Sequence, residues 1–184
     1  MLLILMGKTC SGKDTIAKEL VKLGWDRIVT YTTRKKRRNE KDGKEYHFIS
    51  EPEFLDKINK GFFAEYKSYK IADGSTVYYG SPLEDLQSTS KNKFIILTPQ
   101  GYRDFLSKIN SDHVSVYIYS DDSTIRKRLK ARGDSKEEAQ RRIQADRIDF
   151  RDCEVLVHKI VYNYDGYNIK DVTNKICDIV RSYQ

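Results

Sequence analysis

Residues 2–14 read LLILM followed by GKTCSGKD, and this stretch decides the class of fold. The opening residues are all apolar, which is typical of a strand buried on both faces of a parallel sheet. The residues that follow match the phosphate-loop pattern G-x-x-x-x-G-K, with Asp14 standing where Ser or Thr is usual. A buried strand, a glycine loop and a helix in this order predict a nucleotide-binding α/β fold.

The phosphate loop assigns a chemical role to each of its parts. Its glycines let the backbone wrap closely around phosphate groups with the N–H groups pointing inward, and the following helix adds partial positive charge. Lys13 is expected to reach the β- and γ-phosphates of ATP. A chance glycine turn is the alternative, but the strand before and the helix after it argue against that. The expected ATP-binding residues here are Gly7, Thr9, Cys10, Ser11, Gly12, Lys13, Asp14 and Thr15.

Asp14 is also the expected metal ligand. The hydroxyl that usually occupies this position binds Mg²⁺, and a carboxylate is likewise a hard oxygen donor that suits this cation. The alternative is a plain acid in the first turn of a helix, where the helix dipole stabilises a negative charge.

The rest of the chain alternates strands with helices. Strands are expected at Phe94–Leu97, Val114–Tyr119 and Lys159–Tyr162, with helices at Thr15–Lys22, Leu83–Ser88, Tyr102–Ile109, Ser123–Ala131, Lys136–Phe150 and Ile169–Ser182. This alternation predicts a P-loop NTPase-type parallel sheet flanked by helices. We expect a single domain over 1–184, with its core at 1–30, 81–129 and 151–184, an inserted acceptor-binding subdomain at 31–80 and a helical lid at 130–150.

Apolar side chains predict which helix faces point inward. The first helix is expected to bury Ile16, Leu20 and Val21. A second helix, capped by Ser50 with Pro52 in its first turn, is expected to bury Phe54, Leu55 and Ile58. The last helix carries Ile169, Val172, Ile176, Ile179 and Val180 on one face. Within the insert, Tyr66–Tyr69 and Thr76–Tyr79 are expected to pair as a hairpin around Asp73 and Gly74.

Composition limits the partners of the chain. Its 184 residues carry a net charge of +7, concentrated at 34–38 and 126–151, while 39% of residues are hydrophobic. Two separate basic clusters together with a phosphate loop favour small anionic nucleotides over nucleic acid. No apolar run is long enough to span a membrane, and a monomer or homodimer is expected. Three cysteines, odd in number and far apart, indicate a reducing cytoplasm.

The segment from Thr30 to Phe48 resembles the acceptor-binding signature of guanylate kinases. The spacing of Arg34, Arg37, Glu40 and Tyr46 matches the family pattern without a gap. Further along the chain, FFAEY at residues 62–66 and YYGS at residues 78–81 resemble two more segments of that family. With the phosphate loop, four motifs occur in the family's order.

The resemblance implies a site for GMP. Two guanidinium groups can bind an acceptor phosphate through paired N–H donors. Glu65 offers a carboxylate that suits the N1–H and N2–H₂ donors of guanine. The alternative for the arginines is solvated surface charge, which the register with Glu40, Tyr46 and Tyr79 argues against. The implied GMP-binding residues are Thr30, Arg34, Arg37, Glu40, Tyr46, Glu65, Tyr79, Ser81 and Thr98.

A third region, from Arg128 to Ile143, resembles the family's lid. Arg132 and Arg142 are the expected cations for the transferring phosphoryl group, beside Lys13. An exposed helix with charge on its outer face is the alternative for Arg142. By the same resemblance, Asn163 is expected to lie near the adenine of ATP.

The function implied is ATP-dependent phosphorylation of GMP or dGMP, with ATP as co-substrate and Mg²⁺ as cofactor. One difference from the family is that Ile96 and Thr98 occupy positions where it carries acids. A related kinase of a ribosyl phosphate is the alternative enzyme, and Asp14 favours it. A non-catalytic phosphopeptide-binding module is a further alternative, which Lys13 and both loop glycines argue against.

Overall fold

The computed structural model describes residues 1–38, 40–71, 74–87, 92–108 and 112–184. The chain divides into two compact units. The first comprises Met1–Arg27, Lys91–Gln100 and Asp112–Gln184, and the second comprises Ile28–Ser90 and Gly101–Ser111. The second unit therefore includes all of the segment 31–80 that the sequence sets apart, together with a later piece of chain.

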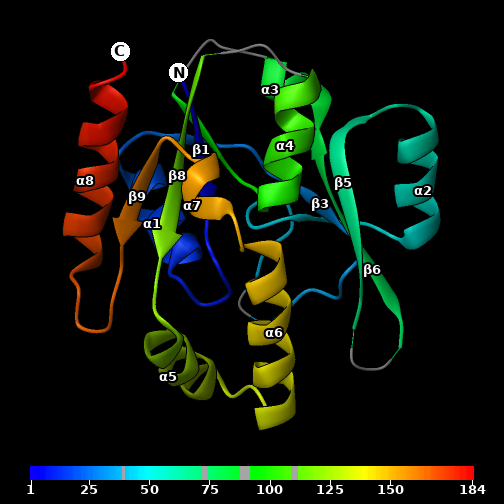
Figure 1. Cartoon of the computed structure of the whole chain (residues 1–184). Coiled ribbons are helices and arrows are strands. Elements are labelled where there is room, and N and C mark those ends of the chain that lie inside the picture. The colour runs from blue at the N-terminus through cyan, green and yellow to red at the C-terminus, as the bar shows by residue number, and fades with distance from the viewer. Residues whose placement is uncertain (39, 72–73, 88–91, 109–111) are drawn as a thin grey trace. The chain divides into compact units, whose positions relative to one another are not determined.

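A five-stranded parallel sheet forms the centre of the first unit, as predicted (Figure 1). Its strands lie in the order β2 (Asp26–Arg27), β7 (Lys93–Ile96), β1 (Leu2–Met6), β8 (His113–Tyr119) and β9 (Lys159–Tyr162). Every residue of β1 is buried, because this strand pairs on both edges and is covered on both faces. The phosphate loop thus starts from the most enclosed strand of the unit.

Two helices share one hydrophobic core with this sheet. They are α1 (Lys13–Lys22) and α8 (Ile169–Arg181). The core unites side chains of β1, β7, β8 and β9 with Ile16, Leu20, Val172, Ile176 and Val180. The prediction that Val21 points inward is wrong, since this side chain is 51% exposed. Ala17, four residues before Val21, is buried in its place, so the buried stripe runs through positions 16, 17 and 20.

The remaining helices of this unit follow β8. They are α5 (Asp122–Arg132), α6 (Lys136–Asp149) and the short α7 (Cys153–Leu156). Asp121 caps α5 by accepting from the Thr124 N–H, and Ser135 caps α6 by accepting from the Glu138 N–H. Gly133 ends α5 with a positive φ of 87°, which glycine adopts without strain.

The second unit contains a smaller sheet in the order β4 (His47–Phe48), β3 (Tyr31–Thr32), β6 (Thr76–Pro82) and β5 (Phe63–Lys70). The predicted hairpin is present, with β5 and β6 antiparallel and longer than expected. Its turn residue Asp73 lies outside the described residues. The same unit holds α2 (Glu51–Asn59), α3 (Leu83–Gln87) and most of α4 (Pro99–Lys108).

Helix α2 is capped by Ser50 as predicted, but it buries fewer side chains than expected. Phe54 is fully buried and stacks on Phe63 with ring centroids 4.5 Å apart. Leu55, predicted to be inward, is 40% exposed, because the single large ring of Phe54 fills the contact with the sheet.

Among the described residues, none of the helices has the length and apolar character needed to cross a membrane. Cys10, Cys153 and Cys177 form no disulfide, and the last two are buried.

Candidate nucleotide-binding site

The loop between β1 and α1 leaves no room for side chains at its two motif glycines. A Cβ added at Gly7 would lie 2.5 Å from the Ser11 Oγ and 2.8 Å from the Ile118 carbonyl oxygen. Gly12 has a φ of 100°, and a Cβ there would lie 2.3 Å from the Asn163 Nδ2. Both positions require glycine for close approach, and Gly12 also requires it for its backbone conformation.

Lys13 is bonded across this loop. Its Nζ donates to the carbonyl oxygens of Gly7 at 2.6 Å and Lys8 at 2.7 Å. Burial lowers the pKa of Lys13, while the negative charges of Asp14 and Asp146 act in the opposite direction. The ammonium group is therefore held inside the loop at its phosphate-binding motif.

Asp146, on α6, contacts the same loop and was not among the predicted residues. Its Oδ2 accepts a hydrogen bond of 2.7 Å from the Thr9 backbone N–H. Burial raises the pKa of this carboxyl group, opposed by the Thr9 N–H and by the charge of Lys13. A phosphate oxygen bound to the Thr9 N–H would have to replace this carboxylate, since both need the same donor.

Asp14 and Thr15 are exposed in the first turn of α1. Within the described ranges, no group of three or more His, Cys, Asp or Glu side chains could hold a metal ion. Asp14 would supply one carboxylate ligand to a Mg²⁺ ion, beside phosphate oxygens and water. This is a common arrangement for Mg²⁺, which keeps several waters and bridges to substrate phosphates.

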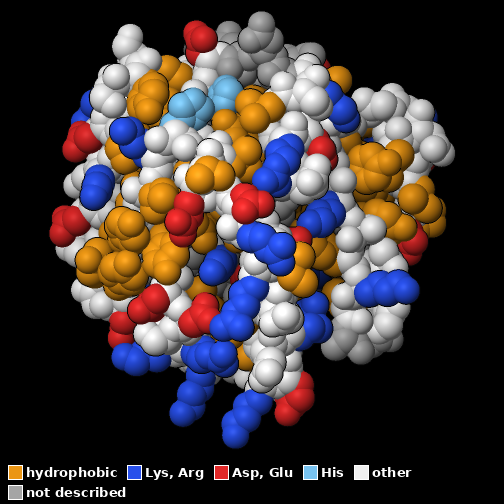
Figure 2. Space-filling view, in the orientation of Figure 1, with side chains coloured by type: hydrophobic (Ala, Val, Ile, Leu, Met, Phe, Trp, Pro, Cys, Tyr) orange, Lys and Arg blue, Asp and Glu red, His pale blue; other side chains and the backbone are white. Residues whose placement is uncertain are grey.

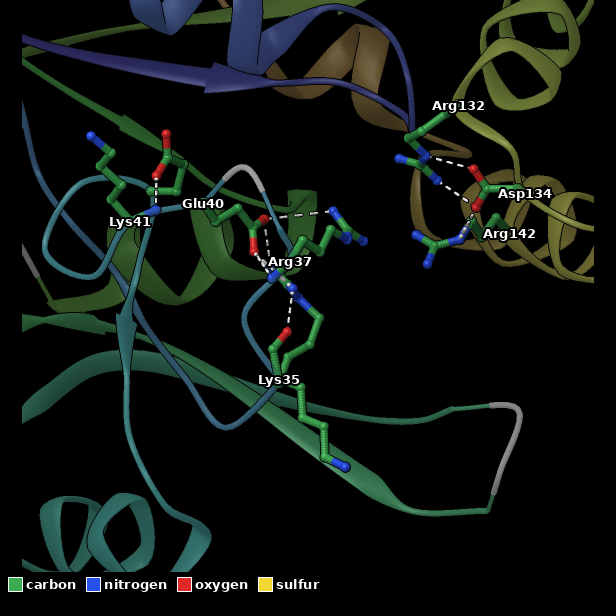
Figure 3. A network of polar contacts seen from close by, with 9 residues as sticks. Lys35, Arg37, Glu40, Lys41, Arg132, Asp134 and Arg142 are labelled. Atoms are coloured by element: carbon green, nitrogen blue, oxygen red, sulfur yellow. Dashed lines mark hydrogen bonds and ion pairs between the residues drawn. The ribbon is translucent and has the colours of Figure 1, made fainter.

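The two predicted lid arginines meet at Asp134. Arg132 donates to both carboxylate oxygens, from Nε at 2.6 Å and from Nη2 at 2.7 Å (Figure 3). The Arg142 Nε lies 3.6 Å from Asp134 Oδ1 and 2.7 Å from Glu138 Oε1, without hydrogen-bond geometry to either. Figure 2 shows Lys and Arg side chains gathered over α5 and α6. Two cations are thus brought together on one acid at the start of α6.

Asn163, the residue that follows β9, is buried beside the phosphate loop. It is only 2% exposed, and its Nδ2 donates to the Ser11 carbonyl oxygen at 2.8 Å. Its side chain is bonded to the phosphate loop itself.

In the second unit, Glu40 organises the predicted phosphate-binding arginines. Arg34 donates to both of its oxygens, at 3.0 and 2.8 Å, and the Arg37 backbone N–H donates at 2.8 Å. The Arg37 guanidinium lies 3.7 Å away (Figure 3). Burial raises the pKa of Glu40, but these two arginines outweigh it and hold the pKa below its ordinary value. Glu40 is therefore ionised and positions the arginines.

Tyrosine rings surround Arg34. Its guanidinium lies 5.4 Å from the centre of the Tyr46 ring, and a hydrogen bond to Tyr79 adds to that from Glu40 in raising its pKa against the effect of burial. The Tyr46 and Tyr79 rings meet edge to face at 5.8 Å. The structure thus brings together Arg34, Glu40, Tyr46 and Tyr79, as the shared signature predicts.

Glu65 and Ser81 form a buried polar pair. They are opposite each other in the register of β5 and β6, and the Ser81 hydroxyl donates to Glu65 Oε1. Glu65 is 8% exposed. Burial raises its pKa, and the charge of Asp104 adds to that rise, while the Ser81 hydrogen bond and the charge of Lys108 oppose it. A buried carboxyl group with one oxygen engaged is suited to a ligand that offers hydrogen-bond donors.

The two remaining predicted acceptor residues are Thr30 and Thr98. Thr30 belongs to the second unit, where its carbonyl oxygen accepts from the His47 N–H at 2.9 Å. Thr98 follows β7 in the first unit, whereas the other predicted acceptor residues belong to the second.

A phosphate loop between a buried central strand and a helix, with a lysine bonded across it, defines a P-loop nucleotide-binding protein. The guanylate kinase family model matches residues 1–183, and the chain belongs to that family.

Proteins of known name and structure are similar to this chain. It is 30% identical to the guanylate kinase of Sulfurimonas denitrificans, covering 100% of this chain and 96% of that protein. It is also 30% identical to the guanylate kinase of Lactiplantibacillus plantarum, covering 99% and 87%. The crystal structure of guanylate kinase from Anaplasma phagocytophilum superimposes with a TM-score of 0.73 at 22% identity, covering 100% of this chain and 86% of that one. This last likeness confirms the predicted fold.

Proposed function

We propose that this protein is a guanylate kinase that transfers the γ-phosphoryl group of ATP to GMP or dGMP. The observation that carries the choice of acceptor is the buried Glu65, held by Ser81. An ionised carboxylate only accepts hydrogen bonds, and guanine presents two adjacent donors on its Watson–Crick edge. Membership of the family supports the same assignment.

The other residues take roles that follow from their charge. Lys13 stabilises the β- and γ-phosphates of ATP, and Arg132 and Arg142 stabilise the phosphoryl group in transfer. To do so, the two arginines exchange part of their pairing with Asp134 and Glu138 for phosphate oxygens.

The acceptor phosphate is assigned to a second set of groups. Arg34 and Arg37 bind it, because Glu40 already orients both, and the hydroxyls of Tyr46 and Tyr79 add donors. The three cysteines, which form no disulfide, support a cytoplasmic enzyme acting on small nucleotides.

The direct test is an ADP-release assay with a panel of acceptors. We expect GMP and dGMP to be used well, and AMP, UMP and ribosyl phosphates to be used poorly, because only guanine pairs both of its donors with Glu65. Activity confined to ribosyl phosphates would contradict the proposed acceptor and leave the phosphate-loop assignment intact. ADP release independent of every acceptor would contradict the kinase assignment.

A separate prediction concerns Asp14 and Mg²⁺. If this exposed carboxylate binds the metal, Asp14→Ser restores the usual hydroxyl and retains activity with an altered preference between Mg²⁺ and Mn²⁺. Asp14→Asn, which lacks the charge, weakens the apparent Mg²⁺ affinity several-fold. The measurement is a Mg²⁺ titration of ADP binding by calorimetry for all three proteins. Identical titrations would remove Asp14 from the metal site.

A further inference from the structure

Two polar side chains donate to carbonyl groups of the phosphate loop, and a third lies beside them. Asn163 donates to the Ser11 carbonyl oxygen at 2.8 Å, and the Ser120 hydroxyl lies 3.4 Å from the same oxygen. The Arg128 Nη1 donates to the Cys10 carbonyl oxygen at 3.1 Å. We call these three side chains the loop anchor.

The members of the loop anchor are also bonded to one another. The Ser120 hydroxyl donates to the Asn163 carbonyl oxygen at 2.7 Å, and Arg128 Nη2 donates to the carbonyl oxygens of Asn163 at 3.3 Å and Tyr164 at 3.2 Å. Ser120 and Asn163 are buried. The planar guanidinium of Arg128 donates to carbonyl oxygens of the loop and of the segment after β9 at the same time. A side chain with one donor, or a flexible ammonium group, does not reproduce this arrangement.

Fixing these carbonyl groups determines where the loop directs its donors. The peptide unit is planar and trans, so its C=O and N–H point in opposite directions. Holding the Ser11 carbonyl toward Asn163 therefore directs the Gly12 N–H to the other side, where a phosphate would accept from it. Asn163 also packs against the Gly12 Cα, since any Cβ there would lie 2.3 Å from its Nδ2.

The loop anchor also influences the position of Arg132. Arg128 precedes Arg132 by one turn of α5, so the two side chains share a helix face. The hydrogen bond to Asp134 raises the pKa of Arg132 against the effect of burial, and Cys10 of the loop and Asp14 of α1 raise it further. A bond from Arg128 to the loop thus sets the position of Arg132 relative to it.

We propose that Asn163, together with Arg128 and Ser120, forms a positioning group. It does not touch the phosphates of ATP, but it strengthens their binding by orienting the phosphate loop. In this role Asn163 does not select the adenine base. The proposal rests on the proposed function only in taking a nucleoside triphosphate as the phosphoryl donor.

The test compares a ligand that has a base with one that lacks it. Binding of ATP and of inorganic tripolyphosphate, each with Mg²⁺, is measured by calorimetry in the wild type, Asn163→Leu and Arg128→Lys. Leu approximates the shape of Asn without its donor, and Lys keeps the charge of Arg without its fork. We expect both variants to weaken both ligands by the same factor, roughly five- to tenfold for the lost hydrogen bonds.

Lys127→Met is the matched control. The Lys127 Nζ bonds Asp165 Oδ2 at 2.7 Å, so it joins α5 to the segment after β9 as Arg128 does, without contacting the loop. We expect no change in either affinity. If Asn163→Leu does not fold, Ser120→Ala, which removes only a hydroxyl, is measured in its place with a smaller equal loss expected.

Three results would overturn the proposal. A loss for ATP with tripolyphosphate unchanged would make Asn163 an adenine contact. An equal loss in Lys127→Met would mean that any loosening of α5 weakens binding. Unchanged binding of both ligands in the anchor variants would remove the anchor from function. A failure of the proposed function is seen separately, because the acceptor assay can fail while tripolyphosphate binding behaves as expected.

Discussion

Lys13→Ala is expected to lower kcat for GMP phosphorylation by roughly 100- to 1,000-fold, the usual loss when a preorganised charge in a transition state is removed. The Lys13 ammonium is held inside the loop by the Gly7 and Lys8 carbonyl oxygens, so it is in place before reaction. Catalysis in phosphoryl transfer is mostly positioning and charge stabilisation. Steady-state kinetics with saturating ATP and GMP measure the effect.

The control for this variant is Lys18→Ala, on the exposed side of the same helix, which is expected to keep its rate. GMP binding to Lys13→Ala should also survive, because Arg34 and Arg37 belong to the other unit of the chain. Near-normal turnover in Lys13→Ala would show that the loop does not carry the phosphoryl donor.

Glu65→Gln is expected to remove most of the preference for GMP over AMP. In the wild type, AMP would place a lone pair of N1 against the buried carboxylate and leave that charge without a partner. A site built on such hydrogen bonds rejects the wrong ligand by about 10⁴-fold or more. The amide of Gln presents N–H donors where guanine also donates, so kcat/KM for GMP falls steeply.

The measurement is kcat/KM for GMP and AMP in the wild type, Glu65→Gln and the control Glu84→Gln. Glu84 is an exposed acid of α3 in the same unit, and its substitution is expected to change neither value. Equal use of AMP and GMP by the wild type would contradict the role of Glu65.

The pH dependence of the reaction tests the role of Glu65 without a substitution. Burial raises the pKa of Glu65 above its ordinary value of 4.5. Because guanine needs the ionised form, kcat/KM for GMP should fall as the pH drops through this raised pKa. The same group favours the folded state while protonated, so its contribution to folding stability is present below the unfolded pKa and is lost as the pH rises through the folded one. In Glu65→Gln, this acidic limb should be absent.

Structural features that depend on residues close together in the sequence were predictable. The parallel sheet, the phosphate loop and the hairpin depend on periodicity and glycine spacing within short stretches. Errors arose at Val21 and Leu55, since an apolar side chain at the edge of a helix stripe is buried only if the packing partner reaches it. Helical periodicity alone does not say how wide the buried stripe is.

What the sequence determined by itself is the local chemistry: a loop that needs Gly7 and Gly12, a lysine that follows it and a signature with Arg34 and Glu40 at fixed spacing. Only the tertiary structure decided that Asp146 accepts from Thr9, 137 residues away, and that Asn163 bonds to Ser11, 152 residues away. Neither pairing leaves a local pattern, because the strands and helices between the partners bring them together. A buried carbonyl or N–H group is bonded by whichever side chain the fold places beside it, since leaving it unpaired is costly.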